Sequence, residues 1–294
     1  MDSGSRQIKI LRDEPLARHT SWRIGGPARL FYIVENEVDL TEALRFAKEN
    51  SLETLIIGAG TNLLVSDKGF PGVTIKLAGS LCDIDIKESR AEVGAAASLS
   101  GLARITTRLG LKGLEFAVGI PGTVGGGLVM NAGAHGGSIG DVVESVTVYT
   151  PKGELELLNK DQIDFGYRSS SLKDSGVILR SSLIFESVNA EKLRAEADRV
   201  IEQRKKCQPG EARTAGSVFK NPQGMKAGGL IEKAGCKGMR VGGAIVSDRH
   251  ANFIINDGTA TANDIFDLIE KVKKQVEEKT GVKMEEEICL VGEF

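Results

Sequence analysis

The sequence predicts an α+β protein with at least two domains. Its 294 residues are 41% hydrophobic, which is enough to build substantial cores in more than one domain. Short strand-like segments occupy much of residues 30–186, and two helical segments interrupt them. Two long amphipathic helical segments follow in the last third of the chain, which favours a domain junction near residue 190.

The first region begins with a predicted β-α-β unit. Residues 30–34 and 54–57 are apolar strand-like runs, and residues 38–49 between them carry apolar side chains at helical spacing. The segments that follow with strand patterns are 73–77, 91–93, 142–150, 154–158 and 177–186. Residues 99–109 are predicted to form a helix among them.

The second region contains the two amphipathic helices. Residues 190–206 place Leu193, Ala197, Val200 and Ile201 on one face, and Pro209 ends this helix. The other helix has Ile265, Ile269, Val272 and Val276 at helical spacing, with Gly281 placed to stop it. Residues 253–255 form a predicted short strand, and the chain closes with an acidic cluster and a strand in residues 285–292.

Composition excludes several classes of protein. The net charge of −2 and the 5% aromatic content argue against a nucleic-acid binder, which needs basic surface or stacking side chains. The N-terminus lacks the apolar core of a signal peptide, and no apolar run reaches the length of a membrane span. The four cysteines and three histidines are scattered and suggest neither disulfides nor a metal site. We therefore expect a soluble, cytoplasmic globular protein.

Residues 119–140 are unusually rich in glycine. Nine of these 22 residues are glycine, and none is Asp, Glu, Lys or Arg. Val124, Leu128 and other apolar residues among them would bury, unlike the residues of a flexible linker. Backbone N–H groups exposed by glycine form anion-binding nests without charged side chains. The stretch therefore predicts a cradle for a phosphate-bearing cofactor, or else a tightly packed turn.

A second glycine pair follows the predicted strand 54–57. Gly58 and Gly60 begin like a dinucleotide fingerprint, but Leu63 occupies the position of its third glycine and no clear helix follows. The chain also lacks a P-loop sequence. A Rossmann domain and a P-loop domain are both unsupported.

Two arginines lie in contexts suited to anions. Arg23 stands between Trp22 and a Gly-Gly-Pro turn, where a guanidinium can pair with phosphate. Arg168 lies in a polar loop, where a fixed guanidinium can stabilise developing negative charge. On these residues alone, an ordinary exposed arginine is the favoured interpretation of each.

Ser217 and Glu287 are candidates for acid–base chemistry. Gly216 permits a tight turn that presents the Ser217 hydroxyl, yet the chain offers no G-x-S-x-G elbow and no convincing Ser-His-Asp set. A hydroxyl acting as a proton donor remains open. Glu287 is the member of the 285–287 acidic cluster that stands directly beside an apolar strand. It is the one we expect at the edge of a site.

Eight short motifs in collinear order together resemble one family. They include Gly119-Ile-Pro-Gly-Thr-Val-Gly125 with Met130-Asn-Ala-Gly133, Phe165-Gly-Tyr-Arg168 and Ala215-Gly-Ser-Val-Phe-Lys-Asn-Pro222, and the others are 19–27, 57–65, 227–231, 246–256 and 285–293. The resemblance is to the UDP-N-acetylenolpyruvoylglucosamine reductases, flavoenzymes of bacterial peptidoglycan precursor synthesis. It covers roughly residues 19–293.

The resemblance implies a fold and a reaction. The family has an FAD-binding fold of the PCMH type with two subdomains, here residues 1–189 divided near 77/78, and an α+β substrate-binding domain, here 190–294. The C-terminal strand is expected to return to the active site. NADPH reduces non-covalently bound FAD and leaves, and the enolpyruvyl sugar nucleotide is then reduced in the same site. A monomer is expected.

The resemblance also implies roles for individual residues. Arg168 and Glu287 would stabilise the intermediate, and Ser217 would donate the proton. The expected cofactor contacts are Arg23, Gly58, Gly60, Thr61, Asn62, Leu63, Gly119, Pro121, Gly122, Thr123, Gly125, Gly126, Asn131, Gly133 and Ala134. The expected substrate contacts are Lys220, Asn221, His135 and His250, and no metal is expected.

Two features of the chain depart from the family pattern, and two alternative functions remain open. The family often has Tyr where this chain has His135, which either replaces the hydrogen bond of the tyrosine or is a packed loop histidine. Only 48 residues separate Arg168 from Ser217 (217 − 168 − 1), as in family members that lack an extra tyrosine-bearing loop. One alternative function is a flavin oxidase of the same cofactor fold that acts on another alcohol or sugar. The other is a catalytically silent nucleotide-binding protein.

Overall fold

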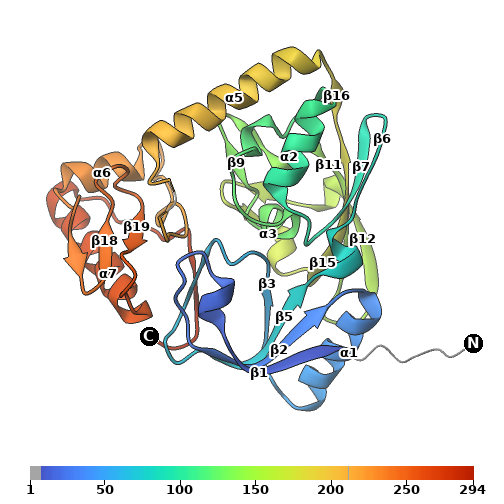
Figure 1. The fold of residues 1–294 in the computed structure, drawn as a ribbon, viewed down its shortest axis with the longest axis horizontal. Coiled ribbons are helices and arrows are strands. Elements are labelled where there is room, and N and C mark those ends of the chain that lie inside the picture. The colour runs from blue at the N-terminus through green and yellow to red at the C-terminus, as the bar shows by residue number, and fades with distance from the viewer. Residues whose placement is uncertain (1–7, 211) are drawn as a thin grey trace, which may run out of the picture. The chain divides into compact units, whose positions relative to one another are not determined.

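The computed structural model describes residues 8–210 and 212–294, which form two compact units (Figure 1). Unit 1 holds residues 8–14, 29–58 and 71–201. Unit 2 holds residues 15–28, 59–70 and the described residues from 202 to 294. Each unit has its own hydrophobic cluster of buried side chains.

The first sheet of unit 1 has the strand order β1-β2-β5-β3. Its strands are β1 (Lys9–Pro15), β2 (Pro27–Val34), β3 (Thr54–Ile57) and β5 (Phe70–Leu77), and β3 runs parallel to β5. Helix α1 (Glu37–Glu49) begins where the side chain of Asn36 accepts a hydrogen bond from the Asp39 N–H, and it buries Leu40, Ala43 and Ala47. The β-α-β unit predicted at 30–57 is present. However, β5 lies between its two strands.

The second sheet of unit 1 is five-stranded and antiparallel, in the order β12-β11-β15-β7-β6. The strands are β6 (Ile84–Lys87), β7 (Arg90–Gly94), β11 (Val143–Tyr149), β12 (Leu155–Asn159) and β15 (Val177–Ile184). Helix α2 (Leu99–Arg108) is capped by Ser98 and buries Leu99, Leu102 and Ala103. The strands and the helix predicted for this region are confirmed, and β6 is an additional strand.

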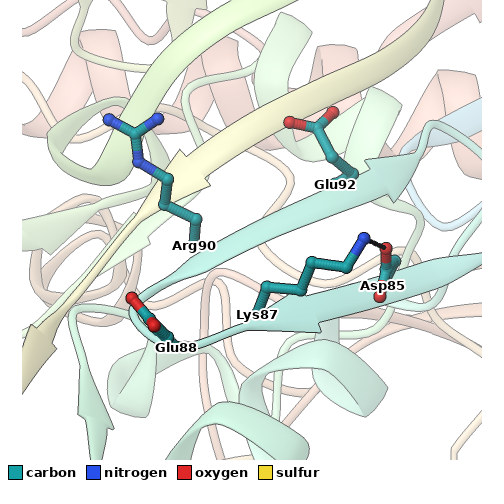
Figure 2. A pocket seen from close by; sticks show the side chains of 5 residues that line it. All are labelled: Asp85, Lys87, Glu88, Arg90 and Glu92. Atoms are coloured by element: carbon teal, nitrogen blue, oxygen red, sulfur yellow. Dashed lines mark ion pairs between the residues drawn. The ribbon is translucent and has the colours of Figure 1, made fainter.

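The hairpin of β6 and β7 carries a hollow lined by charged side chains (Figure 2). The lining residues are Asp85, Lys87, Glu88, Arg90 and Glu92. Asp85 is paired across the strands with Glu92, and Lys87 with Arg90, so charges of the same sign face each other. An ion pair of 2.9 Å between Lys87 and Asp85, along one strand, offsets part of this repulsion. None of the predicted site residues lies here.

Short elements complete unit 1. They are β8 (Leu111–Lys112), α3 (Val124–Val129), β9 (Gly133–Ala134), β10 (Gly137–Ser138), α4 (Ile139–Val142), β13 (Phe165–Gly166), β14 (Ser169–Ser170) and β16 (Glu186–Ser187). Single turns of 3-10 helix occur at Leu16–His19, Gly79–Cys82, Glu115–Ala117, Lys160–Gln162 and Ser171–Lys173, the first of these in unit 2. The glycine-rich stretch, residues 119–140, thus contains helix α3, the β9–β10 hairpin with its two-residue turn, and the start of α4.

Unit 2 combines a small sheet with two helices. Strands β17 (Arg240–Val241), β18 (Ala244–Val246) and β19 (Ile254–Asn256) form an antiparallel sheet, and β4 (Leu63–Val65) pairs in parallel with β20 (Cys289–Val291). The helices are α6 (Ala227–Lys233) and α7 (Ala262–Thr280). Helix α7 begins at a capping box on Thr261 and ends at Gly281, whose φ of 72° is left-handed, as the sequence predicts.

The two units divide the chain differently from the predicted limits at 1–189 and 190–294. Residues 15–28 and 59–70 belong to unit 2, because Trp22 is fully buried in its core and β4 pairs with β20. The unit boundary also falls inside α5 (Ala190–Cys207), after Ile201. In the described part of the chain, no helix is both long enough and apolar enough to span a membrane.

Candidate functional site

The glycine-rich stretch packs its apolar side chains inward and keeps part of its backbone at the surface. Val124 and Leu128 are fully buried, whereas Pro121 and Gly126 are exposed. Helix α3 begins at Thr123, whose Oγ1 accepts a hydrogen bond from the Gly126 N–H at 3.2 Å. Residues 119–134 contain no charged side chain that would repel or compete with an anion. The segment is both packed and suited to an anionic group.

Gly58 lies against this stretch. A Cβ at Gly58 would stand 2.6 Å from Thr123 Oγ1, so only glycine fits unless the threonine moves. Gly58 and Thr123, both predicted to contact the cofactor, are therefore neighbours in unit 1. A glycine-lined, uncharged surface beside the start of a helix fits a cofactor with a pyrophosphate group such as FAD.

Four predicted site residues have a left-handed backbone. The non-glycine residues with positive φ among the described residues are Asp13, Arg23, Ser51, Glu88, Asn131, His135 and Arg168. Arg23, Asn131, His135 and Arg168 belong to the predicted site. Such conformations cost free energy and concentrate at functional sites, where the surrounding structure maintains them. This enrichment is independent of the sequence motifs.

Asn131 and Arg168 fasten the polar loop to the glycine-rich stretch. Asn131 Nδ2 donates to the Gly166 carbonyl at 2.9 Å, and its Oδ1 accepts from the Gly140 N–H at 3.1 Å. Arg168 Nη1 donates to the Gly133 carbonyl at 2.8 Å. The guanidinium also lies 5.4 Å from the ring centre of Tyr167. The structure thus holds Arg168 in a defined place beside three predicted cofactor contacts, Asn131, Gly133 and Ala134.

His135 lies at the tip of the β9–β10 hairpin. His135 and Gly136 form its two-residue turn with φ values of 53° and 88°, and both are exposed. Arg168 holds the base of the same hairpin through Gly133. Exposure at a turn argues against a packed loop histidine, and the predicted contact between His135 and substrate stays a prediction.

Ser217 and Glu287 lie on two segments of unit 2 that pair with each other. The Glu287 N–H donates to the Val218 carbonyl at 2.7 Å, and the Lys220 N–H donates to the Glu285 carbonyl at 2.9 Å. Gly216 has a φ of 78°, as expected for the predicted tight turn before Ser217. Both Ser217 and Glu287 are half-buried. The structure therefore brings the serine segment (residues 216–220) and the glutamate segment (residues 285–287) together.

Asn62 connects the second glycine loop to Glu287. Its Nδ2 donates to the Glu287 carbonyl at 3.0 Å, and its own carbonyl accepts from the Cys289 N–H at 2.9 Å. The last strand, β20, continues this pairing along β4. Gly60 stands at the start of the loop with a φ of 62°, and a Cβ there would meet the His19 carbonyl. The C-terminal strand thus returns to a predicted cofactor loop.

Arg23 lies in unit 2 as well, on the segment before β2. Its Nη1 donates to the Arg18 carbonyl at 3.2 Å, and its side chain is exposed. Its left-handed φ of 59° distinguishes it from an ordinary surface arginine. The predicted cofactor contact of Arg23 stays a prediction.

Asn252 supports the segment that carries Ser217, and the sequence did not single it out. Its amide pairs with both backbone groups of Phe219, at 2.8 Å and 3.0 Å, and its carbonyl accepts from the Val218 N–H at 2.9 Å. The side chain is buried and acts as an extra strand partner for the segment that follows Ser217. Its only signal in the sequence is its place in the motif 246–256.

The predicted substrate contacts in unit 2 lie near these segments. Lys220 Nζ pairs with the carboxylate of Glu285, and Asn221 Oδ1 accepts from the Ala227 N–H at the start of α6. His250 packs edge-on against Phe253, with ring centres 4.8 Å apart. A Cβ at Gly228 of α6 would lie 3.4 Å from the His250 ring. Asn221 and His250 thus both adjoin α6.

We predict that acid destabilises the protein through His250. Burial lowers the pKa of His250 below 6.5, with Lys237 acting in the same direction, and its Nδ1 accepts a hydrogen bond from the Asn252 N–H. The neutral ring is thus favoured in the folded state, so its stabilising contribution is present above pH 6.5 and is lost as the pH falls through the lowered pKa. The free energy of unfolding should fall between about pH 7.5 and about pH 5.5.

Urea unfolding at both pH values measures this effect. In His250→Gln the fall should be smaller than in the wild type, whereas His135→Gln, at the exposed hairpin tip, should retain the wild-type pH dependence. Equal falls in the wild type and His250→Gln would contradict the assignment.

The comparisons with known proteins match both halves of the chain. Residues 28–159 match the model of an FAD binding domain, and residues 208–291 match the C-terminal domain of UDP-N-acetylenolpyruvoylglucosamine reductase. The reductase of that name from Heliobacterium modesticaldum is 42% identical over 96% of this chain and 91% of its own length. The one from Bacillus subtilis is 41% identical over 97% of this chain and 94% of its own length.

A solved structure also matches nearly the whole chain. The crystal structure of a UDP-N-acetylenolpyruvylglucosamine reductase from Thermus caldophilus has a TM-score of 0.85 and 35% identity, and the match covers 97% of this chain and 99% of that one. Both the fold and the near full-length identity point to one family. The chain belongs to the UDP-N-acetylenolpyruvoylglucosamine reductase family.

Proposed function

We infer that this protein is an NADPH-dependent flavoenzyme that reduces the enolpyruvyl group of UDP-N-acetylglucosamine enolpyruvate, giving UDP-N-acetylmuramate for peptidoglycan precursor synthesis. Relatives with 40–45% identity over nearly the whole chain carry the name of this reductase. One structural observation carries the inference for this chain. Two residues predicted to take part in the reaction are each held by a hydrogen bond. The Arg168 side chain donates to the Gly133 carbonyl, and the Glu287 N–H donates to the Val218 carbonyl.

The cofactor is FAD. We propose that the backbone of residues 119–126, with Gly58 and Thr123, holds the pyrophosphate of FAD, and that Gly60, Thr61, Asn62, Leu63, Asn131, Gly133, Ala134 and Arg23 complete its contacts. These residues would hold FAD, and the chemistry that it would supply is transfer of hydride from NADPH to the methylene carbon of the enolpyruvyl group. The absence of charge in residues 119–134 supports this role, because backbone dipoles can then bind the pyrophosphate without competition.

Arg168 and Glu287 are assigned to the charge that develops on the substrate. Hydride addition at the methylene carbon leaves negative charge shared between carbon 2 and the substrate carboxylate. The guanidinium of Arg168 stabilises this enolate-like charge, and the carboxyl group of Glu287 orients or hydrogen-bonds it. The left-handed backbone of Arg168 and its bond to Gly133 support a fixed, preorganised guanidinium.

Ser217 is assigned as the proton donor to carbon 2. Its half-buried place beside the Glu287 segment supports this role. Lys220, Asn221, His135 and His250 are proposed to contact the sugar nucleotide. The enzyme is proposed to act as a monomer in the cytoplasm, and its four free cysteines are in keeping with a reducing compartment.

Anaerobic spectroscopy of the purified protein tests the function. We expect a yellow protein that releases free FAD on denaturation and bleaches with NADPH. The enolpyruvyl sugar nucleotide should then restore the flavin absorbance in the absence of oxygen. Restoration by oxygen alone would favour a flavin oxidase, and a colourless preparation that cannot bind added FAD would exclude both enzymes.

A further inference from the structure

Three consecutive carboxylates, Glu285 to Glu287, lie beside the serine segment in unit 2. Charges of the same sign so close together repel one another unless each finds a partner. Glu285 is paired with Lys220, and Glu286 with Lys273 at 2.7 Å. The backbone of Glu287 is bonded to Val218, and Glu286 forms a bridge with Phe219. The whole acidic segment is therefore fixed in register with the segment that follows Ser217.

Lys273 belongs to α7 and reaches the acidic segment from one side. Its neighbour Val272 is buried in the core of unit 2, so this turn of α7 has a fixed position. Lys273 Nζ donates to Glu270 Oε1 at 2.8 Å and to Glu286 Oε1 at 2.7 Å. These hydrogen bonds raise the pKa of Lys273, first through Glu270 and then through Glu286, so the ammonium stays charged.

The Lys273–Glu286 contact is more sheltered than an ordinary surface ion pair. The side chains of Lys273 and Glu286 are 30% and 25% exposed, whereas the Lys68–Glu293 pair has exposures of 71% and 84%. Solvent screens a sheltered pair less, so its geometry is better defined. Glu286 therefore has a specific anchor on α7.

We propose that Lys273 is a positioning residue for Glu287, acting by anchoring Glu286 to α7. Successive side chains in a paired, extended segment point to opposite faces. An anchor that holds Glu286 toward α7 therefore fixes the face on which Glu287 projects, and it prevents a one-residue slip that would exchange the two carboxylates. This proposal rests on the role of Glu287 in the proposed function.

Four variants test the anchor. Lys273→Met and Glu286→Ala each remove one end of it, the double variant removes both, and Lys273→Arg retains a cation. In stopped-flow experiments each single variant should slow flavin reoxidation by the sugar nucleotide about tenfold to a hundredfold, because small displacements of a reacting group have effects of that size. Bleaching by NADPH should keep its wild-type rate, and Lys273→Arg should restore much of the lost rate.

The double variant separates this role from general destabilisation. If both residues act through one contact, the double variant should be no slower than either single variant. Two controls on the same helix are Lys274→Met, an exposed lysine next in sequence, and Glu270→Ala, which removes the other partner of Lys273. Both should behave as wild type.

Three results would overturn the proposal. One is an unchanged rate of reoxidation in Lys273→Met, and another is equal slowing of both half-reactions. The third is a double variant in which the rate losses of the two single variants multiply. Wild-type protein measured in the same experiment distinguishes failure of the anchor from failure of the proposed function. If wild-type flavin is not reoxidised by the sugar nucleotide, the proposed function fails, whereas a normal wild type with a normal Lys273→Met contradicts the anchor alone.

Discussion

Ser217→Ala should bleach with NADPH at the wild-type rate and then be reoxidised by the sugar nucleotide about 10²–10⁴-fold more slowly, which is the usual contribution of a general acid. The reason is that the hydroxyl is assigned only to protonation of carbon 2, which takes place after the flavin is reduced. Single-turnover absorbance of the flavin measures both steps on one sample.

The variant Ser217→Cys is the control for this prediction. A thiol keeps a proton donor at the same position in the turn formed by Gly216, so it should retain more of the second step than alanine does. If Ser217→Ala slows both steps equally, the serine has a binding role instead, and another group must supply the proton.

Arg168→Met is expected to slow reoxidation by the sugar nucleotide about 10²–10³-fold, which is the cost of losing one preorganised group that stabilises developing negative charge. Arg168→Lys should recover only part of this loss, because an ammonium lacks the planar fork that can bind both Gly133 and a substrate carboxylate. Rapid mixing of the reduced protein with the sugar nucleotide measures the rate.

A loss of loop structure could imitate this effect, and Ser170→Ala tests for it. Ser170 Oγ also fastens the same loop to the glycine-rich stretch, by bonds to Leu128 and Val129 of 2.9 Å and 3.0 Å, but it carries no charge. A modest effect in Ser170→Ala beside a large one in Arg168→Met supports the electrostatic role. Losses of equal size in the two variants would mean that Arg168 only holds the loop in place.

Local sequence patterns predicted most elements of the fold. Helical spacing located α1, α2, α5 and α7, and the glycine at 281 located the end of α7. Long-range pairing was not visible in these patterns. The placement of β5 between β2 and β3, and the pairing of β4 with β20, depend on contacts between segments that no local periodicity connects. For the same reason, the sequence did not place residues 15–28 and 59–70 with unit 2.

The local backbone of the candidate site was predictable where a glycine stands at a turn. Gly216 before Ser217 and Gly122 before Thr123 both have positive φ, a conformation that the glycine in the sequence already indicates. The left-handed backbones of Asn131 and Arg168 were not predictable, since either residue ordinarily adopts other conformations. Asn252 and Lys273 were also missed. They act by supporting the backbone or a neighbouring side chain, and such roles leave no spacing signal.

The fate of hydrogen in the product tests the central claim most directly. The reaction is run without oxygen in deuterated water, with NADPH and the enolpyruvyl sugar nucleotide, and the product is examined by NMR. We expect a lactyl ether with solvent-derived deuterium at carbon 2 in a single configuration, because a fixed donor protonates one face. An unchanged enolpyruvyl group after the flavin has been reduced, or deuterium at carbon 2 in both configurations, would contradict the account.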